Sequence, residues 1–306
     1  MWSFPTCLLL VVAADGTSCH HRRVTGTLFL VGTPIGNLGD LPPRVGDTLA
    51  AADLIAAEDT RRTGRLLAHL ELPDRKLLSF FEGNERERTV EVLRRLRDGA
   101  DVALVTDGGM PTISDPGFRL VRACAAEGID VRVVPGPSAA IAALAVSGLP
   151  TDRFVFEGFL PRKAGERRRR LDSLAEDPRT VVCFESPKRL GAMLIDAQAA
   201  LGDRQAALAR ELTKLHEEVL RGRLSELLDR IGPEPLKGEV VVVIAGAEPA
   251  AEDVTDLVGE ARALVADGTR ARDAARIVAE GHDASANKIY RQLLEPNGEG
   301  VKRDAR

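Results

Sequence analysis

Few side chains in this sequence could hold a transition metal or form a disulfide framework. The five histidines and the four cysteines (Cys7, Cys19, Cys124 and Cys183) form no Cys-x-x-Cys pair, no His-x-x-x-His pair and no mixed cluster. Because protein-bound zinc and similar metals need such clusters, we predict that the chain holds no metal. Cysteines without regular spacing favour reduced thiols and a cytoplasmic location.

Nucleotide-binding signatures, membrane-spanning runs and an excess of positive charge are also missing. There is no G-x-x-x-x-G-K-[ST] motif, and Gly32, Gly36 and Gly39 do not match the G-x-G-x-x-G spacing. No apolar run approaches the ~20 residues that cross a bilayer, so we expect no membrane association. A formal net charge of -4 excludes a wholly basic nucleic-acid coat but allows a local basic patch.

Composition and patterning divide the 306 residues into five segments. In order, they are a leader (1–26), a first α/β segment (27–149), a second α/β segment (150–248), a C-terminal helical module (249–296) and a tail (297–306). The apolar run in the leader lacks the preceding positive charges of a signal peptide. We interpret the leader as a disordered extension or a misassigned start.

The two central segments alternate apolar strands with helical stretches. In the first, strands are expected at 27–31, 53–57, 76–80, 101–106 and 130–134, with helices at 43–51, 60–70, 84–98, 116–127 and 137–146. In the second, strands are expected at 153–159, 180–185, 205–211 and 239–245, with 216–222 as a further candidate, and helices at 163–175, 187–201 and 224–231. The alternation predicts a mostly parallel sheet covered by helices in the first segment, and a second α/β domain. The valine-rich run at 240–244 is typical of a central, fully buried strand.

Three short helices are expected at 252–266, 270–280 and 284–294. Gly268 and Gly281 would mark the turns, and Ser285 could cap the last helix. The pattern resembles a helix-turn-helix module. A helical cap that aids dimer packing is an equally good interpretation.

Two glycine- and proline-rich turns follow apolar strands of the first segment. The first reads Gly-Thr-Pro-Ile-Gly-Asn-Leu over 32–38, and the second reads Asp-Gly-Gly-Met-Pro over 107–111. Glycine permits tight turns and lets bare backbone approach a ligand. Ligands of parallel α/β sheets bind at the carboxyl ends of the strands, where these turns lie. The sequence therefore predicts a small-molecule site there.

Charged side chains follow several other strands, and each has a plain structural interpretation beside a functional one. Residues 58–62 (Glu-Asp-Thr-Arg-Arg) could cap the next helix or bind a polar substrate, and for Asp115 we favour helix capping. Charged residues near 185 and 211 would face the cleft between the segments or pair on the surface. The basic run at 162–170 is either a solvated helix face or a phosphate-binding patch.

Taken in order, these motifs resemble the RNA-modifying branch of the tetrapyrrole methylase superfamily. The segments that carry the resemblance are 31–38, 58–61, 113–117, 135–138, 158–163 and 210–214. Two positions depart from the family pattern. Met110 stands where the family usually has threonine, and Lys188 stands where it commonly has histidine. The first departure bears on one hydrogen bond to the cofactor, and the second weakens the argument for an imidazole base.

The resemblance implies two α/β domains with S-adenosyl-L-methionine in the cleft between them, followed by the small helical module. It also implies a homodimer that methylates the ribose 2′-hydroxyl of a decoding-centre cytidine in the 16S rRNA of the small ribosomal subunit. The implied cofactor-binding residues are Gly32, Pro34, Asp107, Gly108, Gly109, Met110, Ile113, Ser138, Ala139, Phe184, Leu212 and Gly238.

The catalytic and RNA-binding residues are hypotheses built on the same resemblance. Glu185 or Glu211 would act as the general base, and Lys188 or Lys214 would stabilise the developing negative charge. The RNA-binding candidates are Arg61, Arg162, Lys163, Arg167 and Arg168. Two alternatives stay open: methylation of a small tetrapyrrole, and a nucleic-acid-binding regulator with no affinity for a methyl donor.

Overall fold

The computed structural model describes residues 25–232, 237–248, 255–282 and 284–294. These residues form two compact units. One extends to residue 246 apart from residues 176–178, and the other contains those three residues and the chain from residue 247. Almost all of the predicted leader and the whole predicted tail lie outside the described residues.

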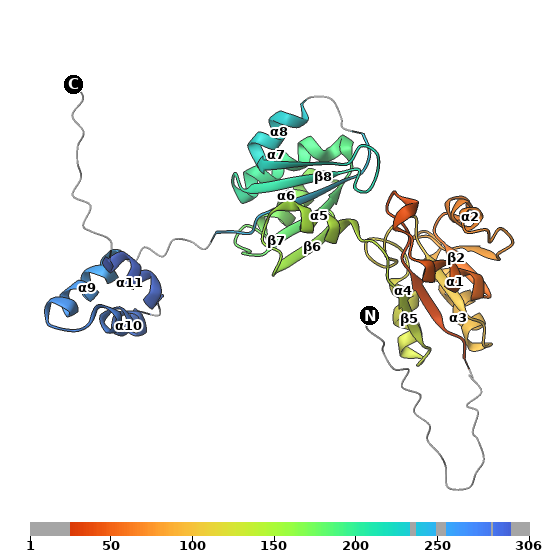
Figure 1. The fold of residues 1–306 in the computed structure, drawn as a ribbon, viewed down its shortest axis with the longest axis horizontal. Helices are drawn as coiled ribbons and strands as arrows, with labels where there is room; N and C mark the ends of the chain where they lie inside the picture. Colours follow the sequence, from red (N-terminus) through yellow and green to blue (C-terminus); the bar gives the residue numbers. More distant parts are fainter. Residues whose placement is uncertain (1–24, 233–236, 249–254, 283, 295–306) are drawn as a thin grey trace, which may run out of the picture. The chain divides into compact units, whose positions relative to one another are not determined.

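The first sheet is entirely parallel, as predicted, with the strand order β3-β2-β4-β1-β5. Its strands are β1 (Leu28–Val31), β2 (Leu54–Ala57), β3 (Leu77–Ser79), β4 (Val102–Val105) and β5 (Val131–Val134). The connecting helices are α1 (Pro43–Ala51), α2 (Thr60–His69), α3 (Glu85–Arg97) and α4 (Phe118–Ala126), and a short 3-10 helix at Leu38–Asp40 follows the first turn (Figure 1).

Both faces of the first sheet are covered, because successive side chains of a strand point to opposite faces. In β4, Val102 and Leu104 pack in the core under α3 and α4. Ala103 and Val105 pack in the core under α1 and α2. This two-sided burial explains why the strands are continuous apolar runs rather than alternating ones.

The second sheet is mixed, with the order β6-β7-β10-β8-β9. Its strands are β6 (Phe154–Phe159), β7 (Thr180–Glu185), β8 (Gln205–Arg210), β9 (Glu218–Arg223) and β10 (Val240–Ile244), and only β6 and β7 pair in parallel. Strand β10 is central and wholly buried, which confirms the prediction for the valine-rich run. The possible strand at 216–222 is present as β9.

Helices cover the second sheet on both faces. Helices α6 (Ala164–Asp172), α7 (Pro187–Leu201) and α8 (Leu224–Ile231) share one core with it. Helix α5 (Ala139–Ser147) packs on the other face through Ala140, Ala143 and Leu144. Helix α5 therefore belongs to the core of the second sheet, although it precedes the predicted segment boundary at residue 149.

The C-terminal unit contains the three predicted helices, α9 (Thr255–Ala266), α10 (Ala271–His282) and α11 (Ala286–Leu294). They share a small core of mostly alanine and valine side chains around Ile289. Gly268 has a φ of +93° in the first turn, as expected. The assignment of Gly281 to a turn is wrong, because it lies within α10. Among the described residues, no helix is long and apolar enough to cross a membrane.

Candidate functional site

The two glycine-rich turns of the first segment meet at the carboxyl edge of the first sheet. Thr33 and Gly109 exchange two backbone hydrogen bonds, each 2.9 Å long. The Thr33 hydroxyl also donates to the Thr106 carbonyl over 3.0 Å. The turn after β1 and the turn after β4 are thus joined into one structure at the edge where the motifs predict a small-molecule site.

A third turn, after β5, approaches the first so closely that only glycine fits. A Cβ added to Gly32 would lie 2.5 Å from the Gly136 nitrogen and 2.7 Å from the Met110 sulfur. A Cβ on Gly108 would lie 3.2 Å from the Pro34 carbonyl oxygen. These contacts bring Gly32, Pro34, Gly108 and Met110 together, and the two glycines leave their own backbone uncovered by a side chain.

A cavity of about 270 Å³ lies beside these turns. Its lining comes from the turn after β1, from α2 and from the end of β4: Thr33, Pro34, Gly36, Leu38, Arg62, Thr63, Arg65, Leu66, Thr106 and Asp107. Backbone and side-chain donors and an acidic side chain therefore surround one hollow at the predicted ligand-binding edge.

Three carboxylates crowd this edge, and Arg62 is paired with only one of them. Arg62 lies 3.4 Å from an Asp107 oxygen, and the Asp107 N–H donates to Glu58 over 3.1 Å. Burial raises the pKa of Glu58. Burial, together with the charges of Glu58 and Asp107, raises the pKa of Asp115 to about 7. In the described part of the chain, no group of three or more candidate ligands is placed to hold a metal ion.

Asp115 was expected to cap α4, and that expectation is wrong. The cap comes from Glu85 of α3, whose Oε1 accepts from the backbone N–H groups of Gly117 and Arg119 at 3.1 Å each. Asp115 is left half-buried beside the other two carboxylates. The sequence did indicate this group of carboxylates in part, because Glu58 follows β2 and Asp107 follows β4, and these two strands are neighbours in the sheet.

The second segment contributes Glu211, Lys214 and Gly238 as one cluster. The Lys214 ammonium lies 2.8 Å from Glu211 Oε1, which also accepts from the Glu239 N–H over 3.0 Å. The hydrogen bond from Lys214 is the main reason that the pKa of Glu211 is lowered. Gly238 has a φ of +94°, which favours glycine, and a Cβ there would also lie 2.3 Å from the Glu211 carboxylate.

Two contacts connect the motifs of the two segments. A Cβ on Gly36 would lie 2.5 Å from Lys214 Cγ, so the lysine stem lies against the turn after β1. A Cβ on Gly158 would lie 2.9 Å from the Ser114 hydroxyl. The predicted sites on the first and second sheets therefore adjoin one another within this unit.

Glu185 and Lys188 lie apart from that cluster in their contacts. Glu185 is 2% exposed, accepts from the Ser186 N–H over 2.6 Å and pairs with Arg189 at 3.0 Å. Lys188 is exposed, and the structure gives it no ion pair within the described residues. Glu185, the last residue of β7, is thus held by the Ser186 N–H and by Arg189 in the first turn of the following helix, α7.

The other predicted cofactor residues occupy varied positions. Phe184 packs against the rings of Phe156 and Phe159, at centroid distances of 5.1 and 5.5 Å. Leu212 and Ala139 belong to the core around α5, and Ser138 precedes the first turn of α5. Ile113 is 47% exposed, and its N–H donates to the Met110 carbonyl. Their contact with a cofactor stays a prediction.

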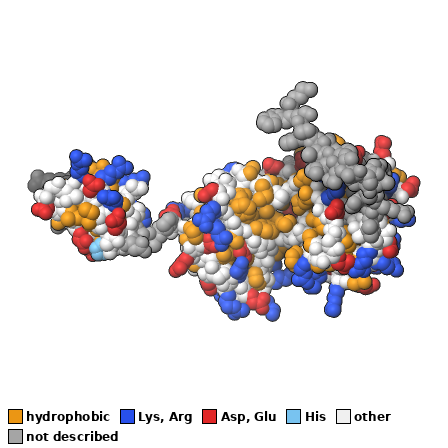
Figure 2. Space-filling model, turned by 90° about the horizontal axis from the view of Figure 1, so that it is seen from below, with side chains coloured by type: hydrophobic (Ala, Val, Ile, Leu, Met, Phe, Trp, Pro, Cys, Tyr) orange, Lys and Arg blue, Asp and Glu red, His pale blue; other side chains and the backbone are white. Residues whose placement is uncertain are grey.

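Most of the predicted RNA-binding cations are paired with carboxylates. Arg167 is 6% exposed and, with Arg168, binds Asp196 of α7. Arg61 binds Asp59, and Lys163 lies 3.3 Å from Glu166. Arg162 is exposed. On the face shown in Figure 2, basic and acidic side chains are interspersed and form no single basic surface.

The sequence is similar to that of known RNA methyltransferases over nearly its full length. The sequence model of the family "Tetrapyrrole (Corrin/Porphyrin) Methylases" matches residues 27–228. A Synechocystis protein named "Ribosomal RNA small subunit methyltransferase I" is 46% identical over 90% of this chain and 100% of its own length. The Thermotoga maritima protein of that name is 51% identical over 73% of this chain and 100% of its own length.

Solved structures share the fold at lower identity. The methyltransferase CobJ matches with a TM-score of 0.57 and 19% identity, over 73% of this chain and 95% of that one. Uroporphyrin-III C-methyltransferase from Thermus thermophilus, complexed with S-adenosylhomocysteine, matches with a TM-score of 0.51 and 23% identity. That match covers 71% of this chain and 97% of the other.

Proposed function

Because the chain belongs to the tetrapyrrole methylase family, we propose that it transfers a methyl group from S-adenosylmethionine to the ribose 2′-hydroxyl of a decoding-centre cytidine in 16S rRNA. The observation that carries this proposal is the match to small-subunit rRNA methyltransferases along their whole length. The small ribosomal subunit is then the macromolecular substrate. A homodimer in the cytoplasm belongs to the same proposal.

The residues at the carboxyl edge fit a methyl donor held largely by backbone. Gly32, Gly108 and Gly136 leave N–H and C=O groups bare at places where a Cβ would collide with neighbouring backbone. When bound, S-adenosylmethionine supplies a methyl group on a positively charged sulfur that an oxygen nucleophile can displace. The unbalanced carboxylates Glu58, Asp107 and Asp115 suit a site for a positively charged ligand.

The chain's own contribution to the reaction is alignment and proton removal. Well-oriented reactants gain roughly 7–11 kcal/mol over free ones, whereas a general base adds typically ~10²–10⁴-fold. Asp115 is the strongest candidate base, because a pKa of about 7 lets it accept a proton near neutral pH. Glu185 and Glu211 remain candidates, although each is held by a cation. Lys214 remains the candidate for stabilising developing negative charge, and its stem lies against the turn after β1.

Methyl transfer to small ribosomal subunits tests the proposal. Subunits from a strain lacking the modification are incubated with labelled S-adenosylmethionine and the purified chain, and the modified nucleotide is mapped by nuclease digestion. We expect label on one cytidine ribose. Label on a small tetrapyrrole but not on the subunit would overturn the RNA substrate. Calorimetry that detects no donor binding would overturn the enzymatic function and favour a nucleic-acid-binding regulator.

A further inference from the structure

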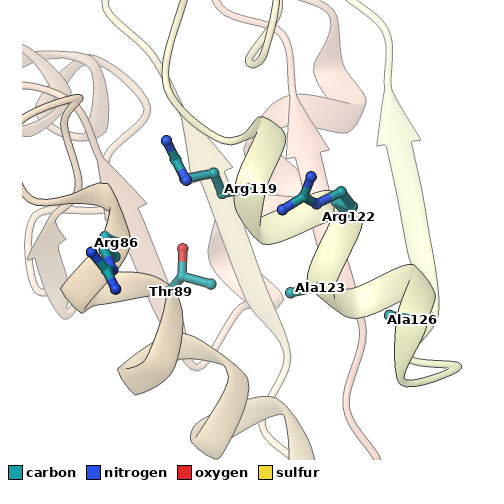
Figure 3. Close-up of a pocket in the computed structure, with 6 residues that line it drawn as sticks. All are labelled: Arg86, Thr89, Arg119, Arg122, Ala123 and Ala126. Atoms are coloured by element: carbon teal, nitrogen blue, oxygen red, sulfur yellow. The ribbon is translucent and has the colours of Figure 1, made fainter.

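A groove between α3 and α4 lies outside the site described above. Its volume is about 540 Å³. The lining residues are Arg86 and Thr89 from α3, and Arg119, Arg122, Ala123 and Ala126 from α4 (Figure 3). The small side chains of Ala123 and Ala126 leave the space open, and no acidic side chain belongs to the lining.

The three arginines of this α3–α4 groove are exposed and, within the described residues, have no carboxylate partner. Elsewhere on α3 the situation is different, because Arg88 and Arg95 both pair with Glu91. Three unpaired guanidinium groups in one groove repel one another, and an anion bound among them relieves that repulsion. Guanidinium also matches the geometry of phosphate oxygens.

Thr89 gives a second and independent indication of a ligand. Its side chain is 9% exposed, and its hydroxyl oxygen is buried with no hydrogen-bond partner. Buried hydroxyl groups are almost always hydrogen-bonded, because an unpaired one loses its bonds to water without replacement. In Figure 3 this hydroxyl lies between Arg86 on one side and Arg119 and Arg122 on the other. Thr89 lines the groove, so a rotation of its side chain would let the hydroxyl donate a hydrogen bond to a ligand oxygen there.

The groove is a built feature of the first segment. Glu85 of α3 accepts hydrogen bonds from the first turn of α4 and so fixes the two helices at their N-terminal ends. Both ends lie at the carboxyl edge of the first sheet. The first turn of α4 follows Asp115 by three residues, so the groove opens beside the candidate site.

An exposed aromatic ring favours nucleic acid over a free anion. Phe118 is 63% exposed, and the Arg122 guanidinium lies over its ring at 5.9 Å from the centroid. Unpaired RNA bases stack on aromatic rings and on guanidinium planes, while arginines hold the adjoining phosphates. Arg122 lines the groove, and Phe118 lies against it, so an aromatic ring and a guanidinium group are close together at this side of α4.

We propose that the α3–α4 groove binds the phosphate backbone of RNA and thereby docks the RNA substrate beside the methyl-donor site. This inference rests on the proposed function. It places the RNA on the first segment, through cations that are far apart in the sequence. The basic run of α6, by contrast, is largely bound to acidic side chains of its own segment.

Removing the groove charges tests the proposal. The variant Arg86→Gln/Arg119→Gln/Arg122→Gln is compared with Lys76→Gln/Arg94→Gln/Arg153→Gln, which removes three exposed cations elsewhere. Binding of each full-length chain to protein-free 16S rRNA is measured at several salt concentrations. Each phosphate contact adds about 0.7 to the salt slope for single strands, so three lost contacts lower the slope by about 2. We expect the dissociation constant to rise at least ~10-fold in low salt for the groove variant only.

Thr89→Val separates ligand binding from folding. Valine keeps the shape and removes a hydroxyl that has no partner in the free protein, so the melting temperature should not fall. We expect RNA binding to weaken by about 2–5-fold, the loss of one hydrogen bond. An unchanged RNA affinity for Thr89→Val would remove the hydroxyl from the site.

The outcomes distinguish this proposal from the proposed function. If the groove variant binds rRNA with the affinity and salt slope of the control variant, the groove proposal fails, even when methyl transfer is observed. Loss of binding to whole subunits but not to protein-free rRNA would assign the groove to a ribosomal protein and overturn it. If rRNA binding depends on the groove but no methyl group is transferred, the groove stands and the proposed function fails.

Discussion

The two sheets carry their charged residues in opposite ways. At the carboxyl edge of the first sheet, Glu58, Asp107 and Asp115 crowd together, and of these three only Asp107 pairs with a cation, Arg62, within the described residues. In the second segment the candidate catalytic carboxylates are paired with cations, Glu185 with Arg189 and Glu211 with Lys214. The pKa values move in opposite directions: burial, together with the neighbouring carboxylates, raises the pKa of Asp115, and the hydrogen bond from Lys214 lowers the pKa of Glu211.

This difference distinguishes a group of carboxylates whose charge is not balanced within the protein from carboxylates that are already paired with cations. Carboxylates held close together without enough cations are unfavourable in the free protein, and such perturbed groups cluster at functional sites. Paired charges, in contrast, fix the positions of helices and loops. A positively charged methyl donor would therefore be stabilised most at the carboxyl edge of the first sheet. The ion pairs of the second segment hold the surrounding residues in position.

The largest expected effect is on the internal pairing of the second segment. Asp196→Ala removes the partner of Arg167, which is only 6% exposed, and leaves a buried cation without compensation. We expect the free energy of unfolding to fall by about 3 kcal/mol, the lower end for buried pairs, because the second partner, Arg168, is exposed. Urea denaturation measures it. The exposed Asp229→Ala is the control, and an equal loss in both variants would contradict the structural role.

The variant Asp115→Asn tests the role of the carboxylates that crowd together at the carboxyl edge of the first sheet. If Asp115 accepts the ribose proton, methyl transfer at saturating donor should fall by ~100-fold or more. In the parent protein the rate should rise with pH through about 7, the pKa of Asp115, and the variant should lose that rise. The matched variants Glu185→Gln and Glu211→Gln identify the base, because only the true one removes the pH dependence.

The same substitution, which should lower the rate of methyl transfer, should raise the stability of the protein at high pH. The pKa of Asp115 is raised above its unfolded value of 3.8, so its favourable contribution is present below pH ~4 and is lost as the pH rises through about 7. Asp115→Asn should therefore be more stable than the parent at pH 8 and no more stable at pH 4. Equal stability of the two proteins at both pH values would refute the crowding.

The glycine-built turns predict the next effect in size. Gly32→Ala places a Cβ 2.5 Å from backbone of the turn after β5, which cannot move freely. We expect donor affinity to fall at least ~10-fold, or about 1.4 kcal/mol. Gly64→Ala is the matched control, because a Cβ there meets nothing within 4 Å and helix α2 should gain stability. Calorimetry with S-adenosylmethionine compares them.

The smallest effect concerns the completed pair of the second segment. The pKa of Glu211 is lowered below 4.5, so its contribution to stability is present above that pH and is lost as the pH falls. Lys214→Met removes the main cause. We expect the stability of the variant to decline less than that of the parent between pH 6 and pH 3. Parallel declines would show that the Glu211–Lys214 pair has no net value.

The sequence predicted the strands and helices well, because their order follows from where apolar runs and turn residues alternate. The sequence did not predict that β10 pairs antiparallel with both of its neighbours, because the direction of pairing depends on how segments that are distant in the chain return to the sheet. The packing of α5 on the second sheet depends likewise on contacts across the boundary. The close approach of the turns at the carboxyl edge of the first sheet was predictable from their glycines, whose contacts leave no room for side chains.

What the sequence did not reveal was which charges are already satisfied. The dense basic run of α6 is a candidate RNA-binding patch in the sequence, yet Asp196, far along the chain, binds Arg167 and Arg168. Asp115 looked like a helix cap because of its position, but Glu85 takes that role from another helix. In both cases a carboxylate about 30 residues away along the chain binds the group in question, and only the three-dimensional structure reveals it.

The mutual hydrogen bonds of Thr33 and Gly109 have a consequence for motion at the ligand-binding edge. Because the two amides are bound to each other's carbonyls, neither turn can swing open while the other stays closed. Their amide protons should consequently exchange with solvent deuterium at a common rate, as a single opening event. Ligand entry would then depend on one concerted fluctuation rather than on two independent loops.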